Sequence, residues 1–257
     1  MSTLLSTLSR KLRSLFRYRR AFKNWPVAAA AGYLGERLGQ ERVLHCRNGS
    51  QVLIRPGIDR VALGEIFVTD NYSPCLGLRD VRHVWDVGGN IGCFAIWAYG
   101  HYPQAQFHSF EPCPTTFERL EKNRELNPQI DWQLHPIGLS NVNDTVQGFT
   151  GEYSDVAGQF TTGGTPFQMK LRRAQEVWEE LGRPRIDILK VDCEGGEYGI
   201  LRDLDGEVLD RVRVVILEYH AVPGQSPETL REILTRHGFQ FDWPGGELNV
   251  VVARHPE

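Results

Sequence analysis

The stretch V-W-D-V-G-G-N-I-G (Val84–Gly92) joins an apolar run to a turn that is rich in glycine. An apolar run that ends at an acid and passes into glycines is typical of a buried parallel strand that leads into a helix. Gly88 and Gly92 let the backbone approach a ligand closely, and the first amides of the following helix point towards it. The stretch therefore predicts an α/β sheet with a ligand site at the carboxyl end of this strand.

From residue 81 onward, short apolar runs alternate with helical patterns, which predicts β-α-β units and a mostly parallel sheet. We expect strands at His83–Val87, Gln106–Phe110, Asp131–Ile137, Ile186–Val191 and Arg213–Tyr219. We expect helices at Cys93–His101, Thr115–Leu126, Arg173–Leu181, Tyr198–Leu204 and Pro227–His237. Two closing strands, Phe239–Trp243 and Glu247–Ala253, flank Pro244-Gly245-Gly246 and predict a C-terminal antiparallel hairpin.

Two other segments depart from this alternation. Residues 1–80 are expected to form a cap, with a helix over Trp25–Gln40 and a hairpin of Arg42–Cys46 and Gln51–Arg55 around Asn48-Gly49. Residues 81–257 are expected to form the main domain. The segment Thr150–Pro166 is rich in Gly and Thr without an apolar period, and is expected to be a long loop.

The first 23 residues carry seven Lys and Arg and no acid, so the remaining chain has 22 bases against 32 acids. An acidic main domain argues against a nucleic-acid partner. Apolar residues recur at helical spacing in this basic arm, at Leu4, Leu5, Leu8, Leu12, Leu15 and Phe16. The arm is therefore expected to be an amphipathic helix. It would contact an anionic membrane through residues 1–23, lie in the groove of a partner, or pack on its own domain.

The composition is that of an ordinary globular protein, with 257 residues, 41% of them hydrophobic and 24% charged. No apolar run is long enough to cross a bilayer, and the start of the chain does not resemble an export signal. The five cysteines form no C-x-x-C pair, so we expect a reducing cytoplasm, with peripheral membrane contact if the arm binds lipid. Nothing here indicates the oligomeric state.

The spacing of acids around the glycine turn indicates which ligand binds there. Glu111 ends the next strand, 25 residues after Asp86, where an acid can accept the hydroxyls of a ribose. The turn matches neither G-x-G-x-x-G nor a phosphate-binding loop, which argues against a nicotinamide-dependent oxidoreductase. Asp86 at the turn would repel a pyrophosphate and suits the ammonium of an amino-acid tail. This pattern predicts S-adenosylmethionine as the cofactor.

A second cluster follows at D-I-L-K-V-D-C-E-G-G-E (Asp187–Glu197). Asp192 ends a strand there, with Glu194 and Glu197 behind it, and such a group of acids is costly unless a cation or a hydrogen-bonding ligand meets it. Glu197 also fits a helix N-terminus, where it would complement the dipole. The last parallel strand brings Glu218 and His220 to the same edge.

With these motifs, the chain resembles the FkbM-type methyltransferases, a branch of the Rossmann-like S-adenosylmethionine-dependent enzymes. The matching stretches are Asp86–Gly92, Phe110–Pro114, Ile137–Ser140, Lys190–Glu197 and Ile216–His220. Gly89 and Gly196 stand where the family usually has Ala. The resemblance implies a class I methyltransferase fold and O-methylation, commonly of a sugar hydroxyl in a glycan, glycolipid or natural product.

The resemblance and the residues together imply the site. The methionine end of the cofactor is expected at Asp86, Gly88, Gly89, Asn90, Gly92 and Asp192, the ribose at Glu111, and the adenine near Pro112 and a turn at Gly138, Leu139 and Ser140. For the acceptor proton, the expected base is His220 first and Asp192 second. Asp192 with Glu194 would orient sugar hydroxyls; a divalent metal held by them is the less favoured alternative. A non-catalytic scaffold recruited through the basic arm is the alternative function.

Overall fold

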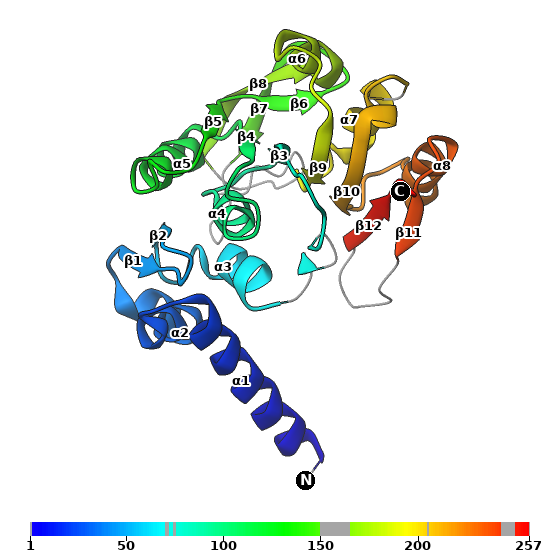
Figure 1. The fold of residues 1–257 in the computed structure, drawn as a ribbon. Coiled ribbons are helices and arrows are strands. Elements are labelled where there is room, and N and C mark those ends of the chain that lie inside the picture. The colour runs from blue at the N-terminus through cyan, green and yellow to red at the C-terminus, as the bar shows by residue number, and fades with distance from the viewer. Residues whose placement is uncertain are drawn as a thin grey trace.

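The computed structural model describes residues 2–69, 72–73, 76–149, 165–204, 206–242 and 250–256. A central sheet of seven strands has the order β11-β12-β10-β9-β3-β4-β5 (Figure 1). Its strands are β3 His83–Val87, β4 Gln106–Phe110, β5 Trp132–His135, β9 Ile186–Val191, β10 Val212–Glu218, β11 Gln240–Asp242 and β12 Val250–Arg254. Strands β3, β4, β5, β9 and β10 are parallel, and β12 runs antiparallel to both β10 and β11. The predicted Rossmann-like class I methyltransferase fold is confirmed.

The core has two layers because side chains alternate between the faces of the strands. Val84, Ile188 and Val214 pack on one face with the N-terminal helices, whereas Trp85 and Leu189 pack on the other with the helices that precede and follow β9 and β10. The helices of the main domain are α4 Cys93–Tyr99, α5 Pro114–Glu125, α6 Ala174–Glu180, α7 Glu197–Asp203 and α8 Pro227–Arg236, with a short 3-10 turn η3 at Leu209–Arg211. Each predicted helix and parallel strand therefore exists, with ends shifted by at most a few residues.

A second, three-stranded sheet was not predicted. It consists of β6 Gly138–Ser140, β7 Asp144–Phe149 and β8 Pro166–Arg173, in the order β6-β8-β7. The prediction of a turn at Gly138–Ser140 is therefore wrong, because these residues pair with Leu171–Arg173. The predicted loop also ends too late, since Pro166 already belongs to β8. Residues 150–164 of that loop, and the predicted turn at 244–246, lie outside the described residues.

The N-terminal part contains α1 Ser2–Ala21, α2 Trp25–Leu34, a 3-10 turn η1 Gly35–Leu38, and the hairpin of β1 Arg42–His45 and β2 Gln51–Ile54. A further helix, α3 Arg60–Phe67, was not predicted. The hairpin is fixed to α5 by two buried amides: Asn127 bonds both backbone groups of Gln51 at 2.8 Å, and Asn123 accepts from the Leu53 amide at 2.6 Å. The division of the chain at residue 80 stays a prediction.

Helix α1 extends away from the rest of the molecule, with the N-terminus at its far end (Figure 1). Its last turns pack on the protein, because Tyr18 and Phe22 are buried and Arg17 donates to the Val68 carbonyl at 2.6 Å. Leu12 and Phe16 are exposed. The side chains of residues 1–11, including Leu4, Leu5 and Leu8, lie outside the described part of the chain. Among the described helices, none combines the length and apolar character that a bilayer span requires.

Candidate active site

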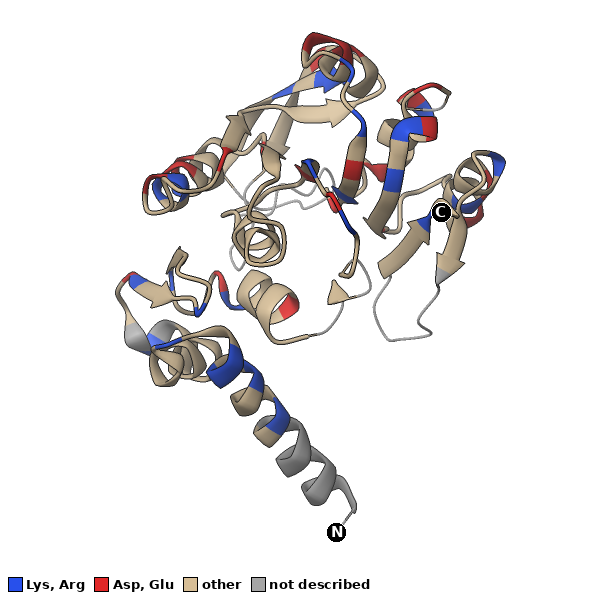
Figure 2. Cartoon of the chain, viewed as in Figure 1, with Lys and Arg blue, Asp and Glu red and all other residues tan. Residues whose placement is uncertain are grey.

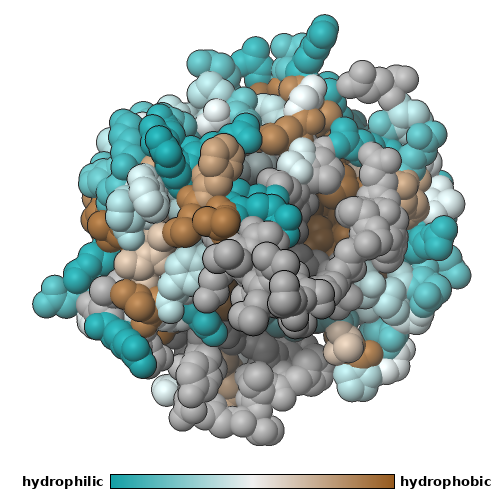
Figure 3. Space-filling view, turned by 90° about the horizontal axis from the view of Figure 1, so that it is seen from below, coloured by the Kyte–Doolittle hydropathy of each residue, from teal (hydrophilic) through white to brown (hydrophobic). Residues whose placement is uncertain are grey.

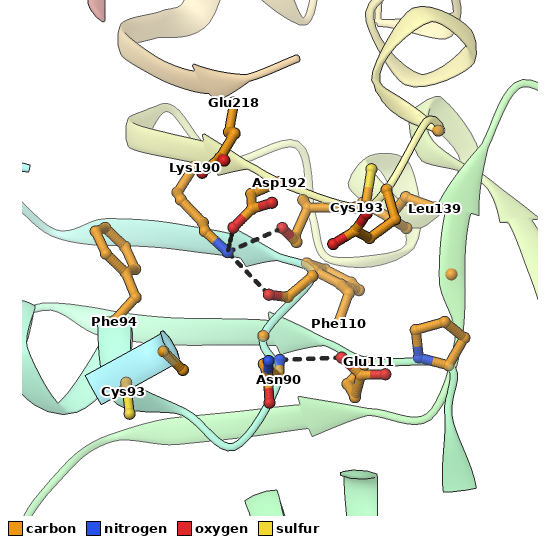
Figure 4. Close-up of a pocket in the computed structure, with 18 of the residues that line it drawn as sticks. Asn90, Cys93, Phe94, Phe110, Glu111, Leu139, Lys190, Asp192, Cys193 and Glu218 are labelled. Carbon is orange, nitrogen blue, oxygen red and sulfur yellow. Dashed lines mark hydrogen bonds and ion pairs between the residues drawn. The ribbon is translucent and has the colours of Figure 1, made fainter. Parts of the chain in front are cut away.

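A cavity of about 350 Å³ lies at the carboxyl ends of β3, β4, β9 and β10 (Figure 4). Strand β3 stands between β4 and β9. The chain adds β4 and β5 on one side of β3 and later adds β9 and β10 on the other, and such a switch point is where sheets of this type bind ligands. All of the predicted site residues line the cavity except Asp86 and Gly92. The unpredicted helix α3 forms a further wall with Ile58, which precedes it, and with Val61 and Glu65.

The glycine turn lies directly against the end of β9. Gly88 has φ +76°, and a Cβ atom there would stand 1.7 Å from the Asp192 carbonyl oxygen, so only glycine fits. At Gly89 a Cβ would approach Ser109 Cβ to 2.9 Å, which makes the alanine usual in the family tight in this chain. The backbone of this turn therefore forms the floor of the cavity.

Gly92 was expected to let the backbone approach a ligand, but it lies away from the cavity surface. It does not line the cavity, and a Cβ atom there would stand 2.3 Å from the ring of Trp132. Gly92 has φ +88° and precedes the first residue of α4. Packing between the turn and β5 therefore requires glycine at this position, and the expected role of Gly92 in cofactor binding stays a prediction.

Glu111 connects the glycine turn to the end of β4. Its Oε2 accepts from the Asn90 amide at 3.0 Å and its Oε1 from the Cys113 amide at 2.9 Å. The side chain is buried, and burial raises the pKa of Glu111 to about 7 against the opposing amide bonds. Each carboxylate oxygen retains a second lone pair, so Glu111 can accept two further hydroxyl donors from the cavity.

Asp86 lies behind the cavity wall and not at its surface. The carboxylate is fully buried; Oδ2 accepts from Ser109 Oγ at 3.1 Å, and Oδ1 lies 3.3 Å from Lys190 Nζ. A ligand ammonium in the cavity therefore meets other groups first. Asp86 does not line the cavity and contacts Lys190, so its expected role towards the methionine ammonium stays a prediction.

Lys190 was not proposed as a site residue. Its ammonium is 5% exposed, donates to the Gly88 carbonyl at 2.8 Å, and also lies 3.4 Å from Asp192 Oδ2 (Figure 4). Although burial opposes the charge, Asp192 and Asp86 raise the pKa of Lys190 well above its ordinary value. The available signal was a lysine near the end of the fully buried strand Ile186–Val191, where an unpaired charge would be prohibitive.

The opposite end of the cavity holds His220, which is positioned by Glu197. His220 Nδ1 donates to Glu197 Oε1 at 2.9 Å, while Nε2 lies 3.5 Å from Glu194 Oε2. This hydrogen bond raises the pKa of His220 to about 9, with the negative charges of Glu197, Glu194 and Asp192 adding to it. A carboxylate that fixes Nδ1 and leaves Nε2 facing a cavity is the geometry of a general base.

Glu197 is both an acid at a helix N-terminus and an acid that meets a hydrogen-bonding partner, the two roles that its sequence position left open. It is the first residue of α7, and its Oε1 also accepts from the Cys193 and Gly195 amides at 3.0 and 3.1 Å. Burial would raise the pKa of Glu197, but the hydrogen bond from His220 reverses this and the pKa is lowered. Glu197 therefore stays ionised and holds the imidazole, a role the sequence alone did not assign.

Further carboxylates surround His220 in the cavity. Burial and repulsion from Asp192 raise the pKa values of Glu65 and Glu218 to about 7 each. Burial also raises the pKa of Glu194. Ligand atoms of Asp192, Glu218 and His220 lie within 4.8 Å of one another, an arrangement that could hold a metal ion. Lys190 and His220 already stand in this group of acids, at 3.4 Å from Asp192 and 3.5 Å from Glu194 respectively.

The third part of the cavity is apolar and lies beside the second sheet. Pro112, Gly138 and Leu139 line it together with Met169 and Leu171 of β8. A Cβ atom at Gly138 would approach Leu171 to 2.9 Å and Pro112 to 3.5 Å, so these residues pack closely around Gly138. A flat aromatic ring suits an apolar wall of this composition.

A family model described as "Methyltransferase FkbM domain" matches residues 86–241, more than half of the chain. The chain is 28% identical to the 31-O-demethyl-FK506 methyltransferase FkbM of Streptomyces tacrolimicus, over 82% of this chain and 96% of that protein. It is 32% identical to the hexuronic acid methyltransferase AglP of Haloferax volcanii, over 59% of this chain and 61% of that protein.

A third relative is far longer than this chain. The AMB antimetabolite synthetase AmbE of Pseudomonas aeruginosa is 32% identical over 68% of this chain, and the match covers 10% of that protein. The similarity to AmbE therefore concerns one segment of it.

Proposed function

Because the chain belongs to the FkbM family of S-adenosylmethionine-dependent methyltransferases, we propose that it methylates a sugar hydroxyl in a glycan, glycolipid or natural product. The relatives support this choice, since one is named for a hexuronic acid and another for an FK506 precursor. The observation that carries the proposal is that Glu111 and His220 line one cavity, with Glu197 holding His220 from behind. The proposed binding group for the ribose and the proposed base for the acceptor hydroxyl thus face the same cavity.

The cavity fits the cofactor in three respects. Glu111 offers buried lone pairs to the two ribose hydroxyls, and the floor of the cavity is bare backbone at Gly88 and Gly89. The apolar wall at Pro112 and Leu139 suits the adenine ring. S-adenosylmethionine, when bound, supplies a methyl group on a cationic sulfur that needs no further activation. Positioning is therefore the main contribution of the protein, and it can lower a barrier by about 7 to 11 kcal/mol.

The methionine end is assigned to Asn90 and Asp192. Asn90 lines the cavity at the start of the turn into α4. Asp192 lines it too, and its carboxylate is 25% exposed while Lys190 contacts only one of its oxygens. Asp192 can therefore meet the ligand ammonium, and Lys190 with Asp86 behind it keeps this carboxylate in place.

His220 is assigned as the base. The acceptor oxygen forms a bond to the methyl carbon as the carbon–sulfur bond breaks, and Nε2 of neutral His220 takes the hydroxyl proton. The products are a methyl ether, S-adenosylhomocysteine and imidazolium. Glu197 stabilises that imidazolium through Nδ1, and Glu194 and Asp192 orient the acceptor hydroxyls. General base catalysis of this type contributes roughly a hundred- to ten-thousand-fold. Asp192 is the second candidate for the base.

No metal enters this proposal. Glu197 already holds Nδ1 of His220 at 2.9 Å, so only Nε2 of this histidine is left for a ligand. Lys190 also contacts Asp192, so two of the three possible ligands are in use. Activity in the presence of a chelator distinguishes the metal-free site from one in which Asp192, Glu218 and His220 bind a metal ion.

A product search tests the proposed function. Wild-type protein is incubated with deuterium-labelled methyl donor and candidate glycans, glycolipid precursors and polyketides, and products are examined by mass spectrometry for a labelled methyl ether. A His220→Asn variant serves as the matched control. A label found on nitrogen or carbon, or equal labelling by the variant, would refute this assignment. The cytoplasmic location stays a prediction.

A further inference from the structure

Exposed hydrophobic side chains are concentrated at the N-terminal end of the chain. Among the described residues, seven large hydrophobic side chains are exposed, and six belong to helices α1, α2 and α3. They are Leu12, Phe16, Val27, Tyr33, Leu34 and Val61; the seventh is Val142. We call these six the N-terminal apolar surface. Hydrophobic side chains gathered on one side of a protein usually mark a binding surface. Figure 3, seen from below Figure 1, shows hydrophobic patches between hydrophilic ones on this side.

Positive charge surrounds the α1 part of this surface. Leu12 is 58% and Phe16 is 66% exposed, and the two lie one helical turn apart. The side chains of Arg13, Arg19, Arg20 and Lys23 are exposed around them. Figure 2 shows Lys and Arg positions in blue, and no Asp or Glu position in red, along the described part of α1. Apolar side chains bordered by cations are the pattern of a helix that lies in the headgroup region of an anionic bilayer.

Contacts connect this surface to the mouth of the cavity. The ring of Tyr33, near the end of α2, lies 6.4 Å from that of Tyr18 in α1. After α2, a Cβ atom at Gly35 would stand 3.4 Å from the Gly57 backbone, so the end of α2 borders the segment that leads into α3. The adjoining residues Ile58 and Val61 line the cavity, and Val61 is also 49% exposed. Helices α2 and α3 thus connect α1 to the wall of the cavity.

We propose that helices α1, α2 and α3 dock the protein on an anionic membrane, and that the acceptor is a lipid-linked sugar that enters the cavity from that membrane. The second part rests on the proposed methyl transfer; the first does not. The lipid would remain in the bilayer beside Leu34 and Val61, while the hydroxyl reaches His220. A nucleic acid would use the cations but leave Leu12 and Phe16 unpartnered, so lipid explains more of the surface.

Vesicle binding tests the docking. Full-length protein is sedimented with vesicles of phosphatidylcholine and phosphatidylglycerol, or of phosphatidylcholine alone, at increasing salt. The double variant Leu12→Ser/Phe16→Ser should bind more than about tenfold more weakly, and Arg13→Gln/Arg20→Gln roughly thirtyfold more weakly. Val142→Ser is the matched control, because its side chain is 45% exposed in another part of the molecule and should bind as wild type does.

The outcomes separate the two parts of the proposal. The docking proposal is refuted if wild-type protein does not bind anionic vesicles, or if it binds a random-sequence RNA instead. It is also refuted if Leu12→Ser/Phe16→Ser and Val142→Ser bind the vesicles equally well. Circular dichroism and thermal unfolding show whether each variant is folded. Methyl transfer to a vesicle-embedded acceptor should fall in Leu12→Ser/Phe16→Ser, while transfer to a water-soluble analogue stays unchanged.

If wild-type protein transfers the methyl group only to soluble acceptors, the proposal of a lipid-linked acceptor is refuted. If wild type binds vesicles but methylates neither kind of acceptor in an otherwise active assay, the proposed function fails and the docking stands.

Discussion

Nδ1 of His220 donates a hydrogen bond to Oε1 of Glu197 across 2.9 Å, although the two residues lie 23 positions apart. The pairing arises because β9 and β10 are adjacent parallel strands, so the segments that leave their carboxyl ends meet at one edge. Glu197 begins the helix after β9, and His220 follows β10 by two residues. The topology of the sheet therefore assembles the proposed base from two motifs that separately resemble an ordinary helix cap and an ordinary loop.

The first prediction concerns the cofactor. Glu111→Ala should weaken S-adenosylmethionine binding by about 1.5 to 3 kcal/mol, because it removes a buried acceptor of two ribose hydroxyls. Isothermal titration calorimetry measures the change. Glu125→Ala, which removes an exposed acid from α5, should bind as wild type does. An unchanged affinity in well-folded Glu111→Ala would remove Glu111 from the cofactor site.

The pH dependence of that affinity follows from the same residue. Since the pKa of Glu111 is raised to about 7, the carboxyl is largely protonated at pH 6 and ionised at pH 8. Hydroxyl donors favour the ionised form, so affinity should increase as the pH rises through about 7. Glu111→Gln should flatten this dependence. A wild-type affinity that does not change between pH 6 and 8 would contradict the assignment.

Lys190 is predicted to hold the site together. Lys190→Met would leave Asp86 and Asp192 without their cation, and loss of one partner of a buried ion pair costs about 3 to 5 kcal/mol. Chemical denaturation should show this loss, and the double variant Asp86→Asn/Lys190→Met should recover part of it. If Lys190→Met is as stable as wild type, the buried Asp86 carboxylate does not depend on the Lys190 ammonium. By the same reasoning, Asp86→Ala should destabilise the protein.

The stability of the unliganded protein should fall as the pH rises through neutrality. Glu65, Glu111 and Glu218 have pKa values raised from 4.5 to about 7. Folding therefore favours their protonated forms, and this contribution is fully present below about pH 4.5 and is lost as the pH passes through about 7. Thermal unfolding from pH 5 to 8 checks the sign. The triple Gln variant should show a smaller decline, and a rising melting temperature in wild type over this range would contradict it.

Periodicity predicted the main sheet because its strands are buried apolar runs and its turns are rich in glycine. The second sheet was missed, although Phe167, Met169 and Leu171 alternate with polar residues, since the glycine-rich segment before them suggested a loop. The burial of Asp86 was not predicted, for a different reason. Sequence position located it at the end of β3, but could not show that Lys190, from the neighbouring strand, would stand between it and the cavity.

The positioning role of Glu197 predicts a shift in the pH profile. Glu197→Gln should move the acid limb of kcat/KM to lower pH, because the hydrogen bond that raises the pKa of His220 is weakened. A merely structural Glu197 would lower stability without moving that limb. The Glu194→Gln variant should produce a smaller shift in the same direction, since Glu194 lies farther away, at 3.5 Å from Nε2.

Single-turnover methyl transfer by His220→Asn, at saturating S-adenosylmethionine and with an acceptor found by the product search, tests the central claim most directly. We predict a rate at least about a hundredfold below that of wild type, with cofactor affinity nearly unchanged. A rate close to that of wild type, in a folded variant under conditions where chemistry is limiting, would contradict the account and transfer the role of base to Asp192.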